Sequence, residues 1–160
     1  MAITEAINSS AERSKVQILQ VLKETIPLNK PLKALEIASG SGIHVGYFAE
    51  HLPNVTWQPS DYDPEDLPSL NAYKQKHANI LQPIVIDIAE PLSLKNTKFD
   101  IILAINLIHI SLWAATLGLF ANAGQILQPQ GDMILLKYLK YENNFRTVNH
   151  LWCAQREWCS

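Results

Sequence analysis

The chain has 160 residues and a formal net charge of −2, and hydrophobic residues make up 48% of it and charged residues 18%. This composition predicts one packed globular domain over residues 1–160 and excludes a largely disordered chain. The mild negative charge argues against a protein that binds nucleic acid through bulk electrostatics. The two cysteines, Cys153 and Cys159, match no zinc-binding spacing, so no metal site is expected.

The first 14 residues contain two glutamates and no apolar run of signal-peptide length, which makes a cytoplasmic location the default expectation. Residues 101–131 contain no Asp, Glu, Lys or Arg and are long enough to span a bilayer. Polar residues such as Asn106 and His109 interrupt this segment, and it divides into a strand, a loop and a helix. We therefore expect the buried centre of a globular domain there and no membrane segment.

Predicted strands and helices alternate along the chain. Ser9 and Glu12 form a capping box, and apolar residues at helical spacing predict a first helix that ends at Pro27. Continuous apolar runs predict buried strands, and the stretches between them predict helices. The predicted strands are 34–38, 55–58, 84–88, 101–105 and 133–136, and the later helices are 43–52, 70–77 and 112–127. After residue 139 the apolar runs end, so one helix but no sixth strand is expected there.

This alternation predicts an α/β fold, with a Rossmann-like, doubly wound and mainly parallel sheet that helices cover on both faces. In such sheets, ligands bind outside the carboxyl ends of the strands, where the strand order reverses. Polar residues that follow the predicted strands are therefore the candidates for a functional site.

Glu36 and the glycines after it form the most informative motif. Gly40 and Gly42 lie between a predicted strand and a predicted helix, where glycines allow a sharp turn and a close approach of a ligand to the backbone. Gly46 extends the motif to a Gly-x-Gly-x-x-x-Gly pattern. Pyrophosphate sites rely on the helix N-terminus and need no carboxylate in the strand, so Glu36 favours a ligand with a positive charge. S-adenosylmethionine carries both an ammonium and a sulfonium group.

Two further carboxylates follow the next strands. Asp61 lies near the end of the second strand, where an acid can accept hydrogen bonds from both ribose hydroxyls. Asp63 is a near neighbour, and spacing alone does not decide which of the two acids would bind the ribose, although Asp61 is closer to the strand. The alternative role of Asp61 is to cap a turn. Asp87 falls within the third apolar strand, and a buried carboxylate there needs a donor. An adenine amino group or a backbone N–H would supply one.

Asn106 and His109 follow the fourth strand, where a substrate would meet a cofactor held by the first loop. His109 could act as a general base near neutral pH, and the alternative is a hydrogen-bonded core histidine. Asn106 could instead hold its own loop through bonds to the backbone. Arg13 and Lys15 in the first helix would either hold an acidic substrate or form a solvated face.

These residues together resemble the class I S-adenosylmethionine-dependent methyltransferases. Four segments resemble, more narrowly, the family called domain of unknown function 938: residues 10–15, 35–44, 57–61 and 106–116. The resemblance covers about residues 10–136. It implies S-adenosylmethionine as the cofactor, a catalytic role for Asn106 and His109, and cofactor binding by Glu36, Gly40, Gly42, Asp61, Asp87 and Asn106.

The C-terminal part departs from this pattern. Methyltransferases of this class continue past the fifth strand with a helix and a strand pair, whereas residues 137–160 match poorly, so we expect a shortened C-terminus. Without the last strands, the fifth strand would be an exposed apolar edge that can pair with a second copy. A homodimer through this edge is the corresponding expectation.

Three functions remain open from the sequence. The first is an active methyltransferase, with a small-molecule acceptor favoured over RNA because the net charge is negative. The second is a non-catalytic cofactor-binding or scaffold protein that has lost the last strands. The third is an NAD-dependent oxidoreductase, which the loop and Asp61 would suit but which Glu36 and the lack of a substrate domain argue against.

Overall fold

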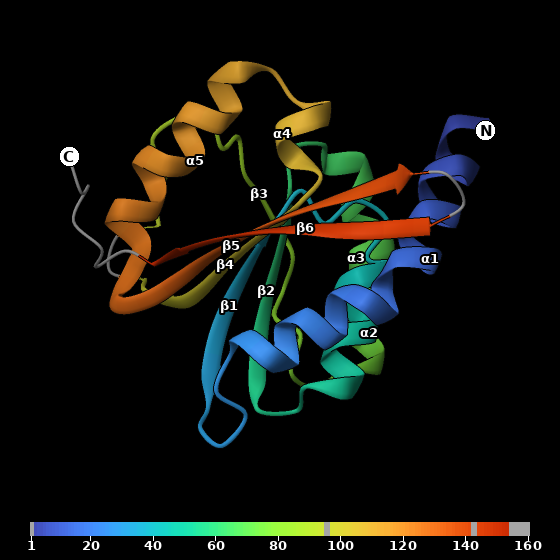
Figure 1. Cartoon of the computed structure of the whole chain (residues 1–160). Helices are drawn as coiled ribbons and strands as arrows, with labels where there is room; N and C mark the ends of the chain where they lie inside the picture. Colours follow the sequence, from blue (N-terminus) through green and yellow to red (C-terminus); the bar gives the residue numbers. More distant parts are fainter. Residues whose placement is uncertain (1, 95–96, 142–143, 154–160) are drawn as a thin grey trace.

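A computed structural model of the chain describes residues 2–94, 97–141 and 144–153, and the side chains of residues 8–94, 97–108 and 110–136. The described residues form a sheet in the order β3-β2-β1-β4-β5-β6, with helices on both faces (Figure 1). The strands are β1 Leu32–Ile37, β2 Val55–Asp61, β3 Ile84–Val85, β4 Phe99–Ile105, β5 Leu127–Tyr141 and β6 Asn144–Cys153. The helices are α1 Ala2–Thr25, α2 Ile43–His51, α3 Leu67–Lys76, α4 Leu107–Ile110 and α5 Trp113–Ile126, with a 3₁₀ helix η1 at Pro64–Asp66.

The first five strands are parallel, and the predicted Rossmann-like fold is confirmed. Strand β1 lies between β2 and β4, so the chain reverses its direction of travel across the sheet after β3. This switch point opens at the carboxyl ends of β1 and β4, which is where open α/β sheets bind ligands.

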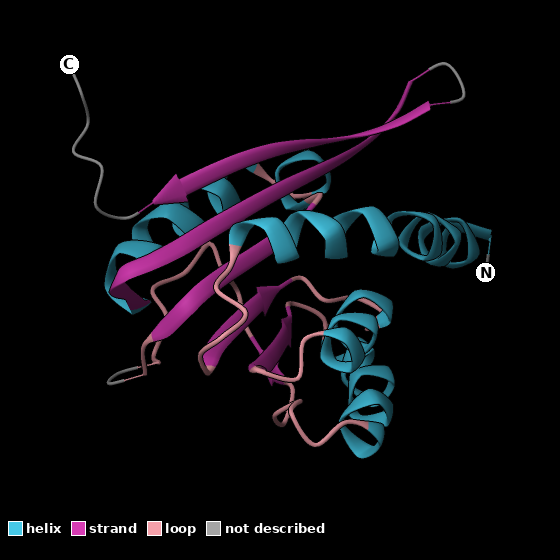
Figure 2. Cartoon of the chain, turned by 60° about the horizontal axis from the view of Figure 1, so that its bottom comes forward, coloured by secondary structure: helices cyan, strands magenta, loops and turns pink. Residues whose placement is uncertain are grey.

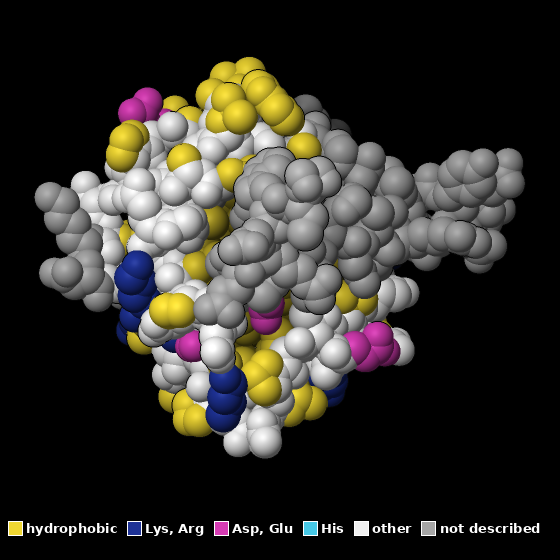
Figure 3. All heavy atoms as spheres, turned by 60° about the vertical axis from the view of Figure 1, so that its left-hand side comes forward, with side chains coloured by type: hydrophobic (Ala, Val, Ile, Leu, Met, Phe, Trp, Pro, Cys, Tyr) yellow, Lys and Arg dark blue, Asp and Glu magenta, His cyan; other side chains and the backbone are white. Residues whose placement is uncertain are grey.

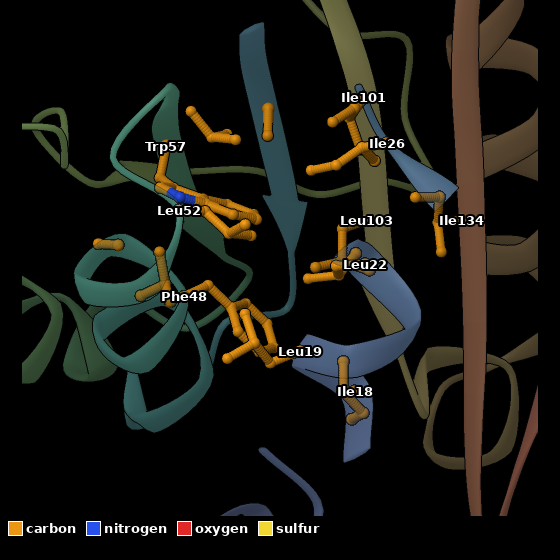
Figure 4. Packing of buried hydrophobic residues seen from close by; sticks show 14 of the residues in the cluster. Ile18, Leu19, Leu22, Ile26, Phe48, Leu52, Trp57, Ile101, Leu103 and Ile134 are labelled. Atoms are coloured by element: carbon orange, nitrogen blue, oxygen red, sulfur yellow. The ribbon is translucent and has the colours of Figure 1, made fainter. Parts of the chain in front are cut away.

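One face of the sheet is covered by α1, α2 and α3, and the opposite face by α5 (Figures 1 and 2). Apolar side chains of α1 and α2 meet those of β1, β2, β4 and β5 in the first core, because each strand sends alternate side chains to that face. Figure 4 labels ten of these residues: Ile18, Leu19, Leu22, Ile26, Phe48, Leu52, Trp57, Ile101, Leu103 and Ile134.

The second core lies under α5. Gly118 of α5 packs directly on the backbone that follows β3, since a Cβ at this position would lie 2.0 Å from the carbonyl oxygen of Ile88. Four residues along, the buried Asn122 donates from Nδ2 to the carbonyls of Ile88 and Glu90 and accepts from the N–H of Leu92. Helix α5 thereby fixes the course of the segment after β3.

Two element boundaries differ from the sequence prediction. Helix α1 begins at Ala2 and runs through Ser9 and Glu12, so the predicted capping box does not start it. Strand β3 comprises only Ile84–Val85, because the chain turns at residues 88–89 instead of continuing the ladder. An apolar run thus continues beyond the strand, with its side chains buried under α5.

A sixth strand, which the sequence pattern did not predict, follows β5. Strand β6 pairs antiparallel with β5 from Asp132 opposite Cys153 to Tyr141 opposite Asn144. An antiparallel strand at the border of a sheet does not need the continuous apolar run of a central parallel strand. Strand β5 is therefore paired on both sides, and the outer ladder that a second copy could meet belongs to β6.

The uncharged segment 101–131 contributes β4, α4, α5 and the start of β5. Across the described ranges, the helices are all too short or too polar to cross a membrane.

Candidate functional site

The carboxyl ends of β1, β2 and β4 bring most of the predicted site residues to one edge of the sheet. In the register, Glu36 of β1 lies between Pro59 of β2 and Leu103 of β4. The loop after β1 and the first residues after β2 and β4 consequently open at the same side.

Glu36 is 2% exposed, and its Oε2 atom has no hydrogen-bond partner among the described residues. Burial raises the pKa of Glu36 from 4.5 to about 7, an effect that the neighbouring Ser39 hydroxyl partly offsets and the negative charge of Asp61 reinforces. A buried carboxylate oxygen without a donor is costly, so it indicates a place for a ligand with a cationic or N–H group.

Asp61 holds the loop after β1 by direct hydrogen bonds. Its Oδ2 atom accepts from the N–H of Gly40 at 2.7 Å, and its Oδ1 atom accepts from the N–H of Asp63 at 3.1 Å. Asp63 instead accepts from the N–H of Glu65 at 2.9 Å and caps η1. Of the two acids that the sequence left open, Asp61 is the one that faces the glycine loop.

The loop glycines have separate roles. Gly40 (φ +52°) and Gly42 (φ +83°) both have left-handed backbones, and a Cβ on Gly40 would meet nothing within 4 Å. Gly40 thus leaves open space beside the loop that a ligand can enter. Gly46 has a structural role, since a Cβ there would lie 2.2 Å from the Tyr73 ring of α3. Ala38 (φ 56°) also has a left-handed backbone, which is strained for alanine.

Asp87 is at the same edge but is exposed, so the buried position that the sequence predicted for it is wrong. The N–H of Ile86 donates to the carbonyl of Asp61 at 2.8 Å, which places Asp87 one residue beyond this link. Asp87 is exposed, and its Oδ1 atom accepts from the N–H of Ala89 at 3.0 Å. Its position results from the short β3, and its carboxylate is accessible to a ligand.

Asn106 follows β4 with a left-handed backbone (φ 61°) and begins α4. Asparagine tolerates this conformation better than most residues, which explains its place at this turn. The N–H of Asn106 donates to the carbonyl of Leu136 in β5 at 2.8 Å. His109 lies in α4, two residues beyond the strand-to-helix turn, and its side chain is outside the described residues.

Arg13 and Lys15 each contact a neighbouring side chain of α1. Arg13 donates to Ser9, and Lys15 pairs with Glu12 while its Nζ atom lies 5.0 Å from the centre of the Tyr47 ring. These contacts support a solvated face at this position rather than a clamp over the pocket.

Two features of this edge have no clear signal in the sequence. Tyr62 is 69% exposed and offers an aromatic face next to Asp61, the candidate for binding the ribose hydroxyls. Ser14 of α1 and His44 of α2 are joined by a 3.0 Å hydrogen bond between Oγ and Nε2. Burial lowers the pKa of His44 from 6.5 to about 4. The bond between Ser14 and His44 joins residues 30 positions apart, which local spacing does not encode.

The fold is that of the class I S-adenosylmethionine-dependent methyltransferases. An O-methyltransferase family protein from Burkholderia thailandensis superposes with a TM-score of 0.69 at 14% identity, over 88% of this chain and 42% of that one. TrmN from Thermus thermophilus gives 0.63 at 19% identity, over 84% and 47%. Coclaurine N-methyltransferase bound to N-methylheliamine and SAH gives 0.60 at 16% identity, over 78% and 36%.

The chain belongs to the family described as protein of unknown function (DUF938), which it matches over residues 5–149. It spans less than half the length of each of the three solved structures.

Proposed function

We propose that the chain binds S-adenosylmethionine and transfers its methyl group to a small-molecule acceptor. The observation that carries this proposal is the buried Oε2 atom of Glu36, which has no donor among the described residues and lies beside the glycine loop. A nicotinamide dinucleotide would place its pyrophosphate at the glycine loop, and the pyrophosphate carries no cationic group for this carboxylate to bind. The resemblance of the fold to methyltransferases supports the same ligand.

The chain offers complementary groups for the ammonium, the ribose and the adenine of this cofactor. Glu36 would accept from the ammonium, the loop at Gly40 leaves room for close approach, and Asp61 retains lone pairs for ribose hydroxyls. Tyr62 would stack on the adenine, whose amino group would donate to Asp87.

The bound cofactor supplies an electrophilic methyl group on a sulfonium, and the protein's contribution is mainly orientation. Alignment of two reactants can lower a barrier by about 7–11 kcal/mol. Asn106 stands at the turn after β4, where it would line the reaction centre. We assign His109 as the general base for an acceptor that must lose a proton, from its position as the third residue of α4.

Calorimetric titration of the purified chain with S-adenosylmethionine, S-adenosylhomocysteine and NADH tests the cofactor. We expect saturable binding of the first two and none of NADH. Glu36→Gln should weaken binding, whereas Glu50→Gln, at an exposed position on α2, should not. Absence of S-adenosylmethionine binding at millimolar concentration, or binding of NADH alone, would overturn the assignment.

A second candidate is cofactor binding without turnover. Incubation with S-adenosylmethionine that carries a labelled methyl group and a small-molecule extract separates the two. Cofactor binding without any labelled product would favour this second function.

A further inference from the structure

An apolar surface follows Asn106 at the carboxyl end of β4. Among the described side chains, five of the nine large hydrophobic residues that are exposed fall between residues 108 and 117: Ile108, Ile110, Leu112, Trp113 and Leu117. We call these five the α4–α5 patch. Figure 3 shows hydrophobic side chains gathered at the top of the molecule, where Figure 1 places the start of α5. Single exposed apolar residues are ordinary, but a contiguous group indicates a binding surface.

The local structure holds this patch out into solvent. Leu107 is buried in the second core, and the N–H and hydroxyl of Ser111 both donate to the Leu107 carbonyl and close the single turn of α4. The chain then leaves the core side, so that Leu112 is 83% and Trp113 is 67% exposed. Surface turns usually carry polar residues at such positions. Because these apolar side chains are exposed, they bury little surface within the described chain and contribute little to its stability.

The position of the α4–α5 patch and its lack of charged residues indicate which kind of molecule it binds. The patch follows Asn106 at the carboxyl end of β4, and β4 pairs in register with β1, which carries the glycine loop. It therefore borders the place where an acceptor must approach the methyl group. Residues 101–131 contain no Asp, Glu, Lys or Arg, so the segment that forms the patch contributes none of these charges to hold a phosphate, carboxylate or ammonium group.

We propose that the α4–α5 patch binds the methyl acceptor, and that the acceptor is a small, uncharged, apolar molecule with a hydroxyl or thiol nucleophile. This inference rests on the proposed function. In the transfer, a lone pair of the acceptor's heteroatom forms the new bond to the methyl carbon, and the carbon–sulfur bond breaks with its electron pair left on sulfur. The products are the methylated acceptor, S-adenosylhomocysteine and one proton released from the heteroatom.

2-Naphthol, a neutral apolar probe with a hydroxyl nucleophile, tests the binding step in the presence of S-adenosylhomocysteine. We expect saturable binding by calorimetry, and at least tenfold weaker binding of the negatively charged 6-hydroxy-2-naphthoate. The double variant Leu112→Ser/Trp113→Ala should weaken 2-naphthol binding by about tenfold or more, since burial of one such side chain contributes roughly that much. The matched control is Leu28→Ser, which removes an exposed leucine before β1, at the opposite edge of the sheet, and should leave binding unchanged.

The outcomes separate this inference from the proposed function. Normal S-adenosylmethionine binding in the double variant, with loss of 2-naphthol binding and of its conversion to 2-methoxynaphthalene, supports the patch as the acceptor site. No binding of 2-naphthol by the wild type, equal binding of the charged analogue, or binding without methylation while a charged acceptor is methylated would overturn it. A double variant that keeps acceptor binding but changes from dimer to monomer in sedimentation would instead make the patch an interface between two copies. Failure of S-adenosylmethionine itself to bind would refute the proposed function.

Discussion

Glu36 combines deep burial with a carboxylate oxygen that has no donor among the described residues. Part of this arrangement is predictable from the sequence, because an acid in a strand followed by Gly-x-Gly fixes the loop locally. The burial was also predicted, but the lack of a donor was not, since it depends on which side chains the helices α1 and α2 bring to this face of the sheet. The exposure of Asp87 was not predicted either, since it follows from the early end of β3.

The raised pKa of Glu36 predicts a pH-dependent affinity for S-adenosylmethionine. A carboxyl group with a pKa of about 7 is mostly neutral at pH 6 and mostly charged at pH 8, and the ammonium of the ligand binds the charged form. Calorimetry should show about tenfold tighter binding at pH 8 than at pH 6. Glu36→Gln should remove this dependence and Glu50→Gln should keep it; an unchanged dependence in Glu36→Gln would contradict the role of this residue.

Asp61 and Asp63 make a matched pair at the end of β2. Asp61→Asn places an amide N–H opposite either the Gly40 N–H or the Asp63 N–H, so the loop loses an acceptor and should reorganise. We expect S-adenosylmethionine to bind at least about tenfold more weakly, the cost of one charged hydrogen bond. Asp63→Asn changes only the cap of η1 and should have less than about a twofold effect. The reverse order of effects would transfer the ribose role to Asp63.

Helix α5 determines the course of the polypeptide after β3. The position of this helix was well predicted, because its run of Ala and Leu ends before Pro129. Its function as an anchor was not predictable, since Asn122 contacts residues about 30 positions earlier in the chain. An asparagine in an apolar helix gives no indication of which backbone groups it will satisfy.

Replacement of Asn122 by alanine should test this anchor. Ile88, Glu90 and Leu92 would each lose a hydrogen bond in a buried or partly buried place, and we expect a loss of about 3 kcal/mol in the free energy of unfolding, at about 1 kcal/mol for each bond. Urea unfolding measures it. Gln125→Ala, on the exposed side of the same helix, should change stability by less than about 0.5 kcal/mol. Equal stability of both variants would show that the bonds do not hold the segment.

The topology of the whole molecule follows in part from the sequence. Alternation of apolar strands and helices was sufficient to predict five parallel strands and two covered faces. Strand β6 was not predictable from its residues, because its polar and aromatic composition has no clear period, and its partner β5 provides the ladder that organises it.

Removal of β6 should therefore change how the molecules associate. A chain that ends at Tyr141 leaves one ladder of β5 unpaired, and an unpaired apolar edge is a template for another chain. We expect self-association in sedimentation velocity at concentrations where the full chain is monodisperse. A shortened chain with unchanged stability and sedimentation would show that β6 adds nothing to the sheet. If the shortened chain does self-associate, the homodimer that the sequence predicts through the edge of β5 applies to this form.

Glu36 and His44 also act on the proton balance of folding, and they act in opposite directions. Between pH 4.5 and 7, folding takes up a proton at Glu36, so this group favours the folded state less as the pH rises. Between pH 4 and 6.5, folding releases a proton from His44, so that group favours the folded state more as the pH rises. Over the shared interval, from pH 4.5 to 6.5, the two exchanges cancel.

The free energy of unfolding of the wild type should therefore change little with pH over this interval. The effect of each group should be measurable only when the other group is replaced. In Glu36→Gln, the free energy of unfolding should rise by roughly 3 kcal/mol from pH 4 to 6.5, and in His44→Gln it should fall by a similar amount from pH 4.5 to 7. Urea titrations across this range measure both slopes, and parallel slopes in the two variants would contradict the assignment. The folded chain thus contains a glutamate whose pKa is raised and a histidine whose pKa is lowered, and their effects on the pH dependence of stability nearly cancel. The raised pKa of Glu36 therefore leaves little trace in the pH dependence of wild-type stability.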